Sequence, residues 1–186
     1  ENPVEVTVSF GFGYPTTDSA GSMSVEVSDS APASEPAATA WLQAFPRRVT
    51  IGQQERQTIR LLASPPAGLP DGEYWARLIV SAKAGQVPVA GVPDSGAISV
   101  GLSLEVRTVI GVVYRKGALT TGIELAPIRA SYASDTVAVR VPMTRTGTAA
   151  YLGTARVQLV DARGTTVAEA DRAVGVYYTL DPRVDV

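Results

Sequence analysis

Residues 98–115 read Ile-Ser-Val-Gly-Leu-Ser-Leu-Glu-Val-Arg-Thr-Val-Ile-Gly-Val-Val-Tyr-Arg. Every even position from Ile98 to Tyr114 is apolar except Thr108, whereas the odd positions up to Arg107 are small or charged. A period of two residues is typical of a β-strand with one apolar face, because successive side chains point to opposite sides. Eighteen residues would span roughly 60 Å, so we expect this strand to bend or to serve more than one neighbour.

The end of this segment departs from the simple alternation. Gly111 is a natural bend point, since a glycine inside a strand often marks a bulge or kink. The odd positions also become apolar at Val109 and Val113. We therefore expect both faces of the strand to be buried from Val109 onward.

The rest of the chain also alternates with a period of two and shows no long helical period. The first strand covers residues 4–10, with Val4, Val6, Val8 and Phe10 on one face. Further alternating runs, separated by glycine- and proline-rich turns, occur at residues 21–27, 57–62, 73–81, 137–143, 155–159 and 174–178. Short strands at regular spacing favour an all-β sandwich with essentially no helix.

Two domains are expected, at residues 1–117 and 118–186, both immunoglobulin-like β-sandwiches. Strands of the second domain are predicted to begin near Ile123, Val137, Ala155, Val167 and Val174. A complete immunoglobulin-like sandwich takes roughly 100 residues, so the second domain is expected to lack its last strands. Pro182 is poorly suited to the interior of a sheet, so the chain from Leu180 onward is predicted to leave the sheet or run along its edge.

Composition excludes several classes of function. The chain has no cysteine and no histidine, so it lacks disulfides, thiolate sites and the usual general base. We predict that it is not an enzyme and that it holds no cofactor and no metal. The net charge of −2 gives no basic footprint for nucleic acid, and no apolar run is long enough to span a membrane.

Two short motifs carry no binding function. Gly11-Phe-Gly13 lacks the third glycine of a dinucleotide fingerprint and precedes no helix. Asp71-Gly-Glu73 is read as a turn rather than a calcium site, because Asp-Gly is a common turn pair. Three aromatic residues are expected to fill the core rather than to bind a sugar: Trp41, Tyr74 and Trp75.

Three motifs in order resemble the PapD-like periplasmic chaperones of pilus assembly. The first is Val49-Thr-Ile-Gly followed by Gln-Glu-Arg-Gln-Thr-Ile-Arg-Leu-Leu at residues 54–62, and the second is Leu69-Pro-Asp-Gly-Glu73. The third is the long strand, which ends in Val-Val-Tyr-Arg at residues 112–115. Together they cover roughly residues 41–117, and residues 118–186 fit by strand pattern only.

The resemblance implies a mechanism and a location. Members of the family are two-domain proteins of the bacterial periplasm that lend a strand to an incomplete fibre subunit, a form of β-augmentation. By position, the lent residues are Val100, Leu102, Leu104 and Val106. Glu73 and Arg115 match the family's interdomain ion pair.

The chain departs from the family at the site that anchors the subunit's terminal carboxylate. The family uses an arginine on the first strand and a lysine on the long strand. The first strand here, Val4 to Phe10, has no arginine, and the lysine position falls on Gly111.

Three functions therefore stay open: a chaperone of fibre assembly, a periplasmic or surface fibre subunit that polymerises, and a generic adhesive or scaffolding module. In each the partner is a protein, either a fibre subunit or a second copy. The short second domain favours an exposed apolar groove, because an unfinished sandwich leaves a face uncovered. Either the chain is truncated at Val186, or a second copy supplies the missing strand, with residues 4–10 as the expected donor.

Overall fold

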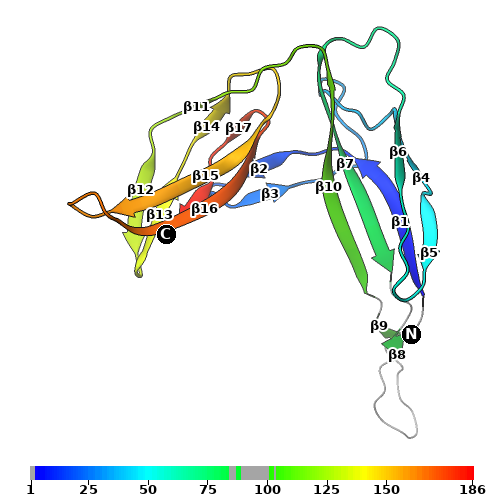
Figure 1. Ribbon diagram of the computed structural model, residues 1–186, viewed down its shortest axis with the longest axis horizontal. Helices are drawn as coiled ribbons and strands as arrows, with labels where there is room; N and C mark the ends of the chain where they lie inside the picture. The colour runs from blue at the N-terminus through cyan, green and yellow to red at the C-terminus, as the bar shows by residue number, and fades with distance from the viewer. Residues whose placement is uncertain (1–2, 84–86, 89–100, 103) are drawn as a thin grey trace, which may run out of the picture. The chain divides into compact units, whose positions relative to one another are not determined.

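The computed structural model describes residues 3–83, 87–88, 101–102 and 104–186 (Figure 1). Among these residues all regular elements are β-strands and no helix is present. The prediction of an all-β chain with essentially no helix is confirmed for this part of the sequence. The chain divides into two compact units.

The two units interleave along the chain. The first comprises Glu1–Phe12, Asp29–Leu69 and Trp75–Val113, and the second comprises Gly13–Ser28, Pro70–Tyr74 and Tyr114–Val186. The sequence predicted two consecutive domains divided after residue 117. The third passage of the chain into the second unit, at Tyr114, lies close to that boundary, but the earlier segments Gly13–Ser28 and Pro70–Tyr74 were not expected there.

The first unit is built on a four-stranded sheet with the order β10-β7-β1-β5. These strands are β1 (Val4–Gly11), β5 (Arg48–Ile51), β7 (Gly72–Lys83) and β10 (Glu105–Lys116). β1 is central and antiparallel to both neighbours, and Val6 lies opposite Val49 of β5 and Ala82 of β7. β10 and β5 are therefore the edge strands.

Two strand pairs complete the described part of the first unit. They are β4 (Leu42–Phe45) with β6 (Arg60–Ala63), and β8 (Val87–Pro88) with β9 (Gly101–Leu102). The core clusters Val6 and Val8 of β1 with Ala44 of β4 and Leu78 of β7. The predicted core tryptophans are also buried at positions 41 and 75.

The second unit contains four small sheets. Three-stranded sheets have the orders β11-β14-β17 and β12-β13-β18, and the pairs β15-β16 and β2-β3 form two-stranded sheets. The bounds are β2 (Pro15–Thr17), β3 (Met23–Val25), β11 (Ile123–Leu125), β12 (Arg129–Ala133), β13 (Thr136–Arg140), β14 (Met143–Arg145), β15 (Tyr151–Val160), β16 (Thr166–Val176), β17 (Thr179–Leu180) and β18 (Arg183–Asp185).

Hydrogen bonds to the C-terminal strands hold the hairpin of β2 and β3 in the second unit. The Arg140 guanidinium donates to the backbone oxygen of Ser19 and to the carboxylate of Asp181. The backbone N–H of Asp181 donates to Oγ1 of Thr17 at 3.1 Å. This polar network explains why the hairpin belongs to the second unit, and no period in the sequence signals it.

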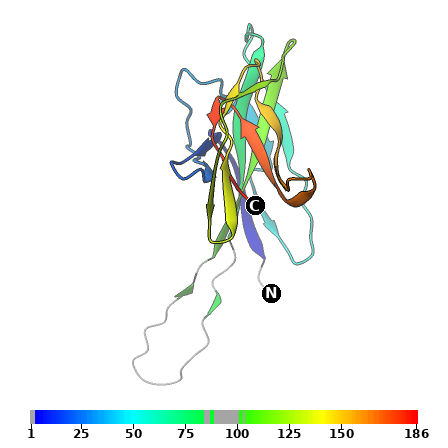
Figure 2. The ribbon, with the colours of Figure 1, turned by 90° about the vertical axis from the view of Figure 1, so that its left-hand side faces the viewer.

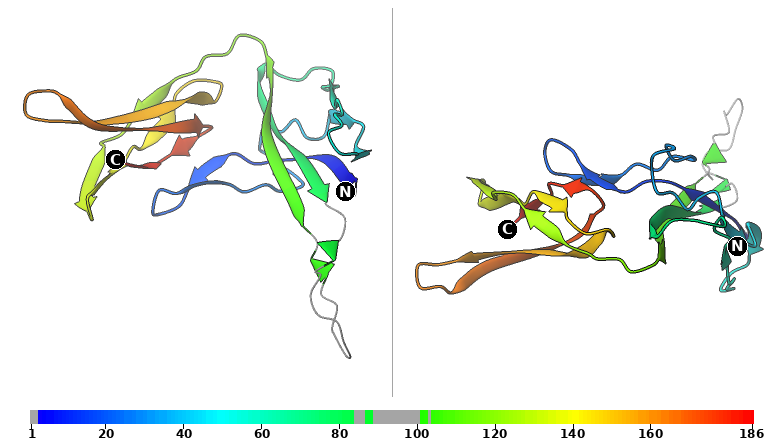
Figure 3. Two further views of the ribbon diagram at one scale, coloured as in Figure 1. Left: turned by 60° about the horizontal axis from the view of Figure 1, so that its bottom comes forward. Right: turned by 90° about the horizontal axis from the view of Figure 1, so that it is seen from above.

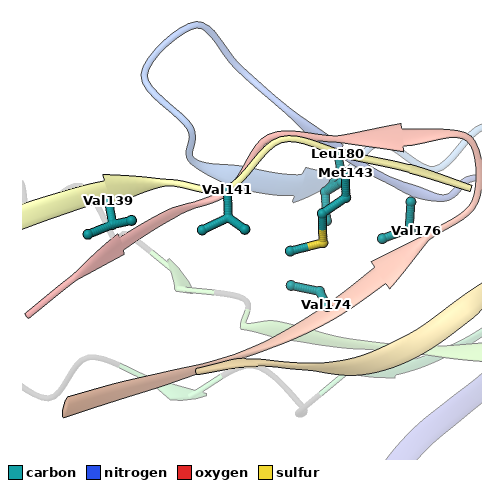
Figure 4. Packing of buried hydrophobic residues seen from close by; sticks show 6 residues of the cluster. All are labelled: Val139, Val141, Met143, Val174, Val176 and Leu180. Atoms are coloured by element: carbon teal, nitrogen blue, oxygen red, sulfur yellow. The ribbon is translucent and has the colours of Figure 1, made fainter. Parts of the chain in front are cut away.

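A cluster of apolar residues forms the core of the second unit. Its buried members are Val139, Val141, Met143, Val174, Val176 and Leu180. Figure 4 shows Met143 and Val174 pointing toward one another from different strands. The core is therefore packed most tightly where β14 and β17 face the C-terminal end of β16.

Several predicted strand limits differ from the structure. The run 137–143 is divided into β13 and β14, because Pro142 has no N–H to give to a ladder. The predicted strands at Val167 and Val174 form the single strand β16. The chain after Leu180 does run along an edge, since β18 is the outer strand of its sheet.

Candidate strand-binding surfaces

β10 is an edge strand with a free side. Among the described residues it pairs only with β7, at the end of the four-stranded sheet (Figure 1). An edge strand presents a row of unpaired backbone N–H and C=O groups, which can pair with another chain. At 12 residues it is long for an edge strand.

The start of β10 exposes apolar side chains. Leu104, just before the strand, is 60% exposed and Val106 is 54% exposed. Val109 and Ile110 are exposed as well, and half-burial begins only at Val112. The expectation that both faces are buried from Val109 onward is therefore wrong. β10 has a neighbouring strand on one side only, and its residues before Val112 do not pack against the core.

The other predicted strand-lending residues lie partly outside the described structure. Val100 lies outside the described residues. The backbone of Leu102 belongs to β9 and pairs with Val87 of β8. The described part of the stripe thus consists of Leu104 and Val106.

Charged residues alternate with the apolar stripe. Glu105 and Arg107 are exposed, as expected for a solvated edge. The Glu105 carboxylate lies 3.7 Å from Nζ of Lys83 on β7. Exposed ion pairs of this kind add little stability, so the charges mainly set which strands can pair with β10.

A buried arginine lies beside Gly111, where the family resemblance expects a lysine. A Cβ added at Gly111 would lie 2.8 Å from Nη1 of Arg77, which is buried on β7. β10 therefore carries no cation at this level, but the adjacent strand does. The alternation of residues 73–81 puts Arg77 on the same strand face as Trp75 and Ile79, and nothing in that local pattern points to Gly111.

The predicted ion pair between Glu73 and Arg115 is present. Nε of Arg115 donates to the Glu73 carboxylate at 2.7 Å, and the backbone N–H of Ala150 donates to its other oxygen at 2.9 Å. The Glu73 side chain is only 1% exposed, and a buried carboxylate needs such partners. Both charged residues belong to the second unit, so this ion pair lies within one unit and the interdomain role implied by the resemblance is not seen.

The predicted donor strand at the N-terminus is occupied within its own unit. β1 is paired on both sides, and Val6 and Val8 are buried in the core, with Val4 and Phe10 packed against it. Donating this strand would require the sheet to open at its centre. The structure therefore argues against residues 4–10 as a donor.

The second unit contains an apolar groove, although the unit is longer than residues 118–186 because it includes Gly13–Ser28 and Pro70–Tyr74. The groove has a volume of about 540 Å³ and lies between β15 and the strands β11 to β14. Tyr151, Ala155, Val157 and Leu159 line it from β15, and Leu125 is among the residues opposite. Figures 2 and 3 show the β12–β13 hairpin and the β15–β16 hairpin apart from one another.

The outer face of the β15–β16 hairpin is polar. Arg156 donates two hydrogen bonds of 2.7 Å to Asp171, and Gln158 donates to Glu169 at 3.0 Å. The hydrogen bond from Arg156 holds the pKa of the Asp171 carboxyl below its ordinary value. β15 thus has one apolar face toward the groove and an outer face on which polar residues lie between the exposed Leu152 and Val160.

Metal sites and membrane-spanning helices are both absent from the described part of the chain. It contains no group of three or more acidic, histidine or cysteine residues placed to hold a metal ion. It also contains no helix with the length and hydropathy required to cross a bilayer.

Comparisons with known proteins add no relative. No family model matches the chain, and neither curated proteins nor solved structures give a significant match.

Proposed function

We propose that this chain is a non-enzymatic protein of the bacterial cell envelope that binds another protein by β-strand addition at β10. The main observation in support is that β10 is a long edge strand at whose start Leu104 and Val106 are exposed. A monomeric protein gains nothing for its own core from such a stripe. Exposed apolar surface at a free strand edge is typical of a protein interface.

The proposed mechanism is β-augmentation. The free backbone groups of β10 pair with a partner strand, which supplies affinity independent of sequence. Leu104 and Val106 then enter pockets of the partner, which supplies specificity. Glu105 and Arg107 stay in solvent and disfavour pairing with strands of unsuitable charge.

The proposed partner is an incomplete fibre subunit, and the proposed architecture is a pair of immunoglobulin-like sandwiches. Both are supported by the resemblance of residues 41–117 to PapD-like chaperones, which also supports a location in the periplasm or at the cell surface. The absence of histidine and cysteine supports a binding role over catalysis.

Photo-crosslinking at β10 tests this function. A benzophenone amino acid at position 106 is expected to give a defined adduct in envelope fractions of the source cells, and Leu104→Asp in the same chain is expected to abolish it. The matched control carries the probe at Leu62, an exposed leucine on β6 of the same unit. Equal adducts at both positions, or none at position 106, would contradict strand addition at β10.

A second candidate is a fibre subunit, and the groove of the second unit favours it. A subunit that polymerises by strand exchange needs a place for an incoming strand, and β15 borders such a groove. Size-exclusion chromatography with electron microscopy separates the two candidates. Filaments of the purified protein favour a subunit, whereas discrete monomers or heterodimers favour a chaperone.

A further inference from the structure

The groove of the second unit has room for one more strand. The β15–β16 layer has two strands, whereas each of the sheets β11-β14-β17 and β12-β13-β18 has three. In this unit, which the structure describes throughout, β15 pairs only with β16. A strand added along the free side of β15 would satisfy its backbone groups and cover the groove at the same time.

The groove sets the chemistry of that strand. Its walls are apolar, so every second residue of the incoming strand must be apolar. Arg156 is the single charged residue among those that line the groove, all of which lie in the described part of the chain. The Arg156 guanidinium is already bound by two hydrogen bonds to Asp171 on the outer face, so the residues between the apolar ones of the incoming strand need only be polar and lie on that solvent side.

We propose that the occupant is β10 of a second copy of this chain. The inference rests on the proposed function in taking β10 as the strand that is added. Leu104 and Val106 give the required alternation of exposed apolar side chains, with the exposed polar residue Glu105 between them. The two strands also match in length, with 12 residues in β10 and 10 in β15.

No other described strand of the first unit fits the groove as well. The remaining edges belong to β4, β5 and β6, which have four residues each, and to the two-residue strands β8 and β9. β1 has a suitable pattern but is paired on both sides. β10 alone combines a free edge, sufficient length and an exposed apolar stripe.

The contact joins two different surfaces, which determines the kind of assembly. β10 from Glu105 to Val113 belongs to the first unit, whereas β15 and its groove belong to the second. A contact between two unlike surfaces is heterologous, and it produces open chains unless a rotation closes them into a ring. Each copy would give β10 to one neighbour and accept β10 from another.

A mixing experiment tests this contact. Leu104→Asp removes the donor and Leu125→Asp removes the acceptor, because each places a charge on an apolar contact. We expect wild-type protein to form a concentration-dependent series of oligomers in sedimentation velocity. Each variant alone is expected to associate about tenfold or more weakly, since loss of one apolar contact removes at least about 1.4 kcal/mol.

The equimolar mixture of the two variants gives the distinguishing result. Each Leu104→Asp copy keeps a groove and each Leu125→Asp copy keeps a donor, so the mixture is expected to form 1:1 dimers that do not extend. Leu152→Asp is the matched control, since Leu152 is exposed on the opposite face of β15 and should associate as the wild type does. Leu125 is itself 52% exposed, so its replacement should leave the unit folded.

Each other result overturns the inference in a defined way. Wild-type protein that stays monomeric refutes it, while photo-crosslinking of a foreign partner at position 106 can still uphold the proposed function. Wild-type behaviour of Leu125→Asp refutes the groove as acceptor. A variant at Leu104 that associates normally refutes β10 as donor, and in that case the proposed function fails only if the crosslink at position 106 is also absent.

Disulfide trapping provides a second measurement that does not depend on weakened association. Because the natural chain has no cysteine, each introduced thiol is unique. Copies with Glu105→Cys mixed with copies with Gln158→Cys, or with Thr154→Cys as the next register, are expected to give mixed disulfide dimers under oxidation. Dimers formed only between two Glu105→Cys copies would show β10 paired with β10 and would contradict the proposed contact.

Discussion

β1 and β10 have nearly the same sequence pattern and opposite environments. Both alternate apolar and polar residues, and both belong to the same sheet of the first unit. Val8 of β1 is 4% exposed, whereas Val106 of β10 is 54% exposed. The difference comes from position, because β1 has a strand on each side and a core beneath it, whereas β10 has one neighbour. Alternation therefore identifies an apolar face but does not say what covers it.

The largest expected effect separates these two strands. Val8→Asp would place an unpaired carboxylate in the core beside Val6 and Leu78. We expect a loss of about 4 kcal/mol or more in the free energy of unfolding, which is a large part of the stability of an ordinary domain. Equilibrium urea unfolding measures it. A loss below about 1 kcal/mol would show that β1 is not a core strand.

Two glutamates, Glu73 on β7 and Glu105 on β10, allow a second comparison between a buried and an exposed carboxylate. Glu73 is buried and accepts hydrogen bonds from Arg115 and Ala150. Glu73→Ala leaves the buried N–H of Ala150 without its acceptor, so we expect a loss of about 1–3 kcal/mol in urea unfolding. Glu105→Ala, at the exposed pair with Lys83, is the matched control and should change stability by less than about 1 kcal/mol.

Glu73→Gln sharpens the same comparison. The amide oxygen of glutamine can still accept from Ala150, so this variant should recover part of the loss. Equal losses for the alanine and glutamine variants would mean that the charge, rather than the hydrogen bond to Ala150, is what Glu73 contributes.

Much of the fold could be predicted from the residue pattern, and the features that the pattern missed have physical causes. Period two predicted β1, β7, β10 and the all-β class, because the alternation of a strand is local. A groove was expected because residues 118–186 alone are few for a sandwich, but the second unit also takes in Gly13–Ser28 and Pro70–Tyr74, so the groove that is present does not rest on that length. By contrast, the attachment of Gly13–Ser28 to the second unit depends on long-range hydrogen bonds such as Asp181 to Thr17, which no local pattern encodes.

The candidate site was predicted only in part for a similar reason. The resemblance, not their own pattern, singled out Leu104 and Val106 as lent residues. The structure shows both exposed, whereas the similar pattern in β1 is buried. Arg77 was missed beside Gly111 because it comes from the neighbouring strand, so only the pairing of β7 with β10 brings the two residues together. Residues across a sheet are adjacent through strand order, which the sequence does not state.

The smallest expected effect concerns the exposed face of the β15–β16 hairpin. The hydrogen bond from Arg156 lowers the pKa of Asp171 below its ordinary value of 3.8. A carboxyl whose pKa is lowered by folding stabilises the folded state above its unfolded pKa, and this stabilisation is lost as the pH falls through the folded pKa. Asp171→Asn should therefore slightly lower the urea midpoint at pH 7 and make no difference well below pH 3.8. A difference that grew on acidification would contradict this sign.

The most direct test of β10 as a binding strand is the unfolding free energy of the double variant Leu104→Asp/Val106→Asp. Because both side chains are more than half exposed, we predict that the free energy of unfolding in urea changes by less than about 1 kcal/mol relative to the wild type. The measurement is made at a protein concentration low enough to keep the variant and the wild type monomeric. A loss of several kcal/mol would show that the stripe belongs to the protein's own core, and strand addition through these residues would then be excluded.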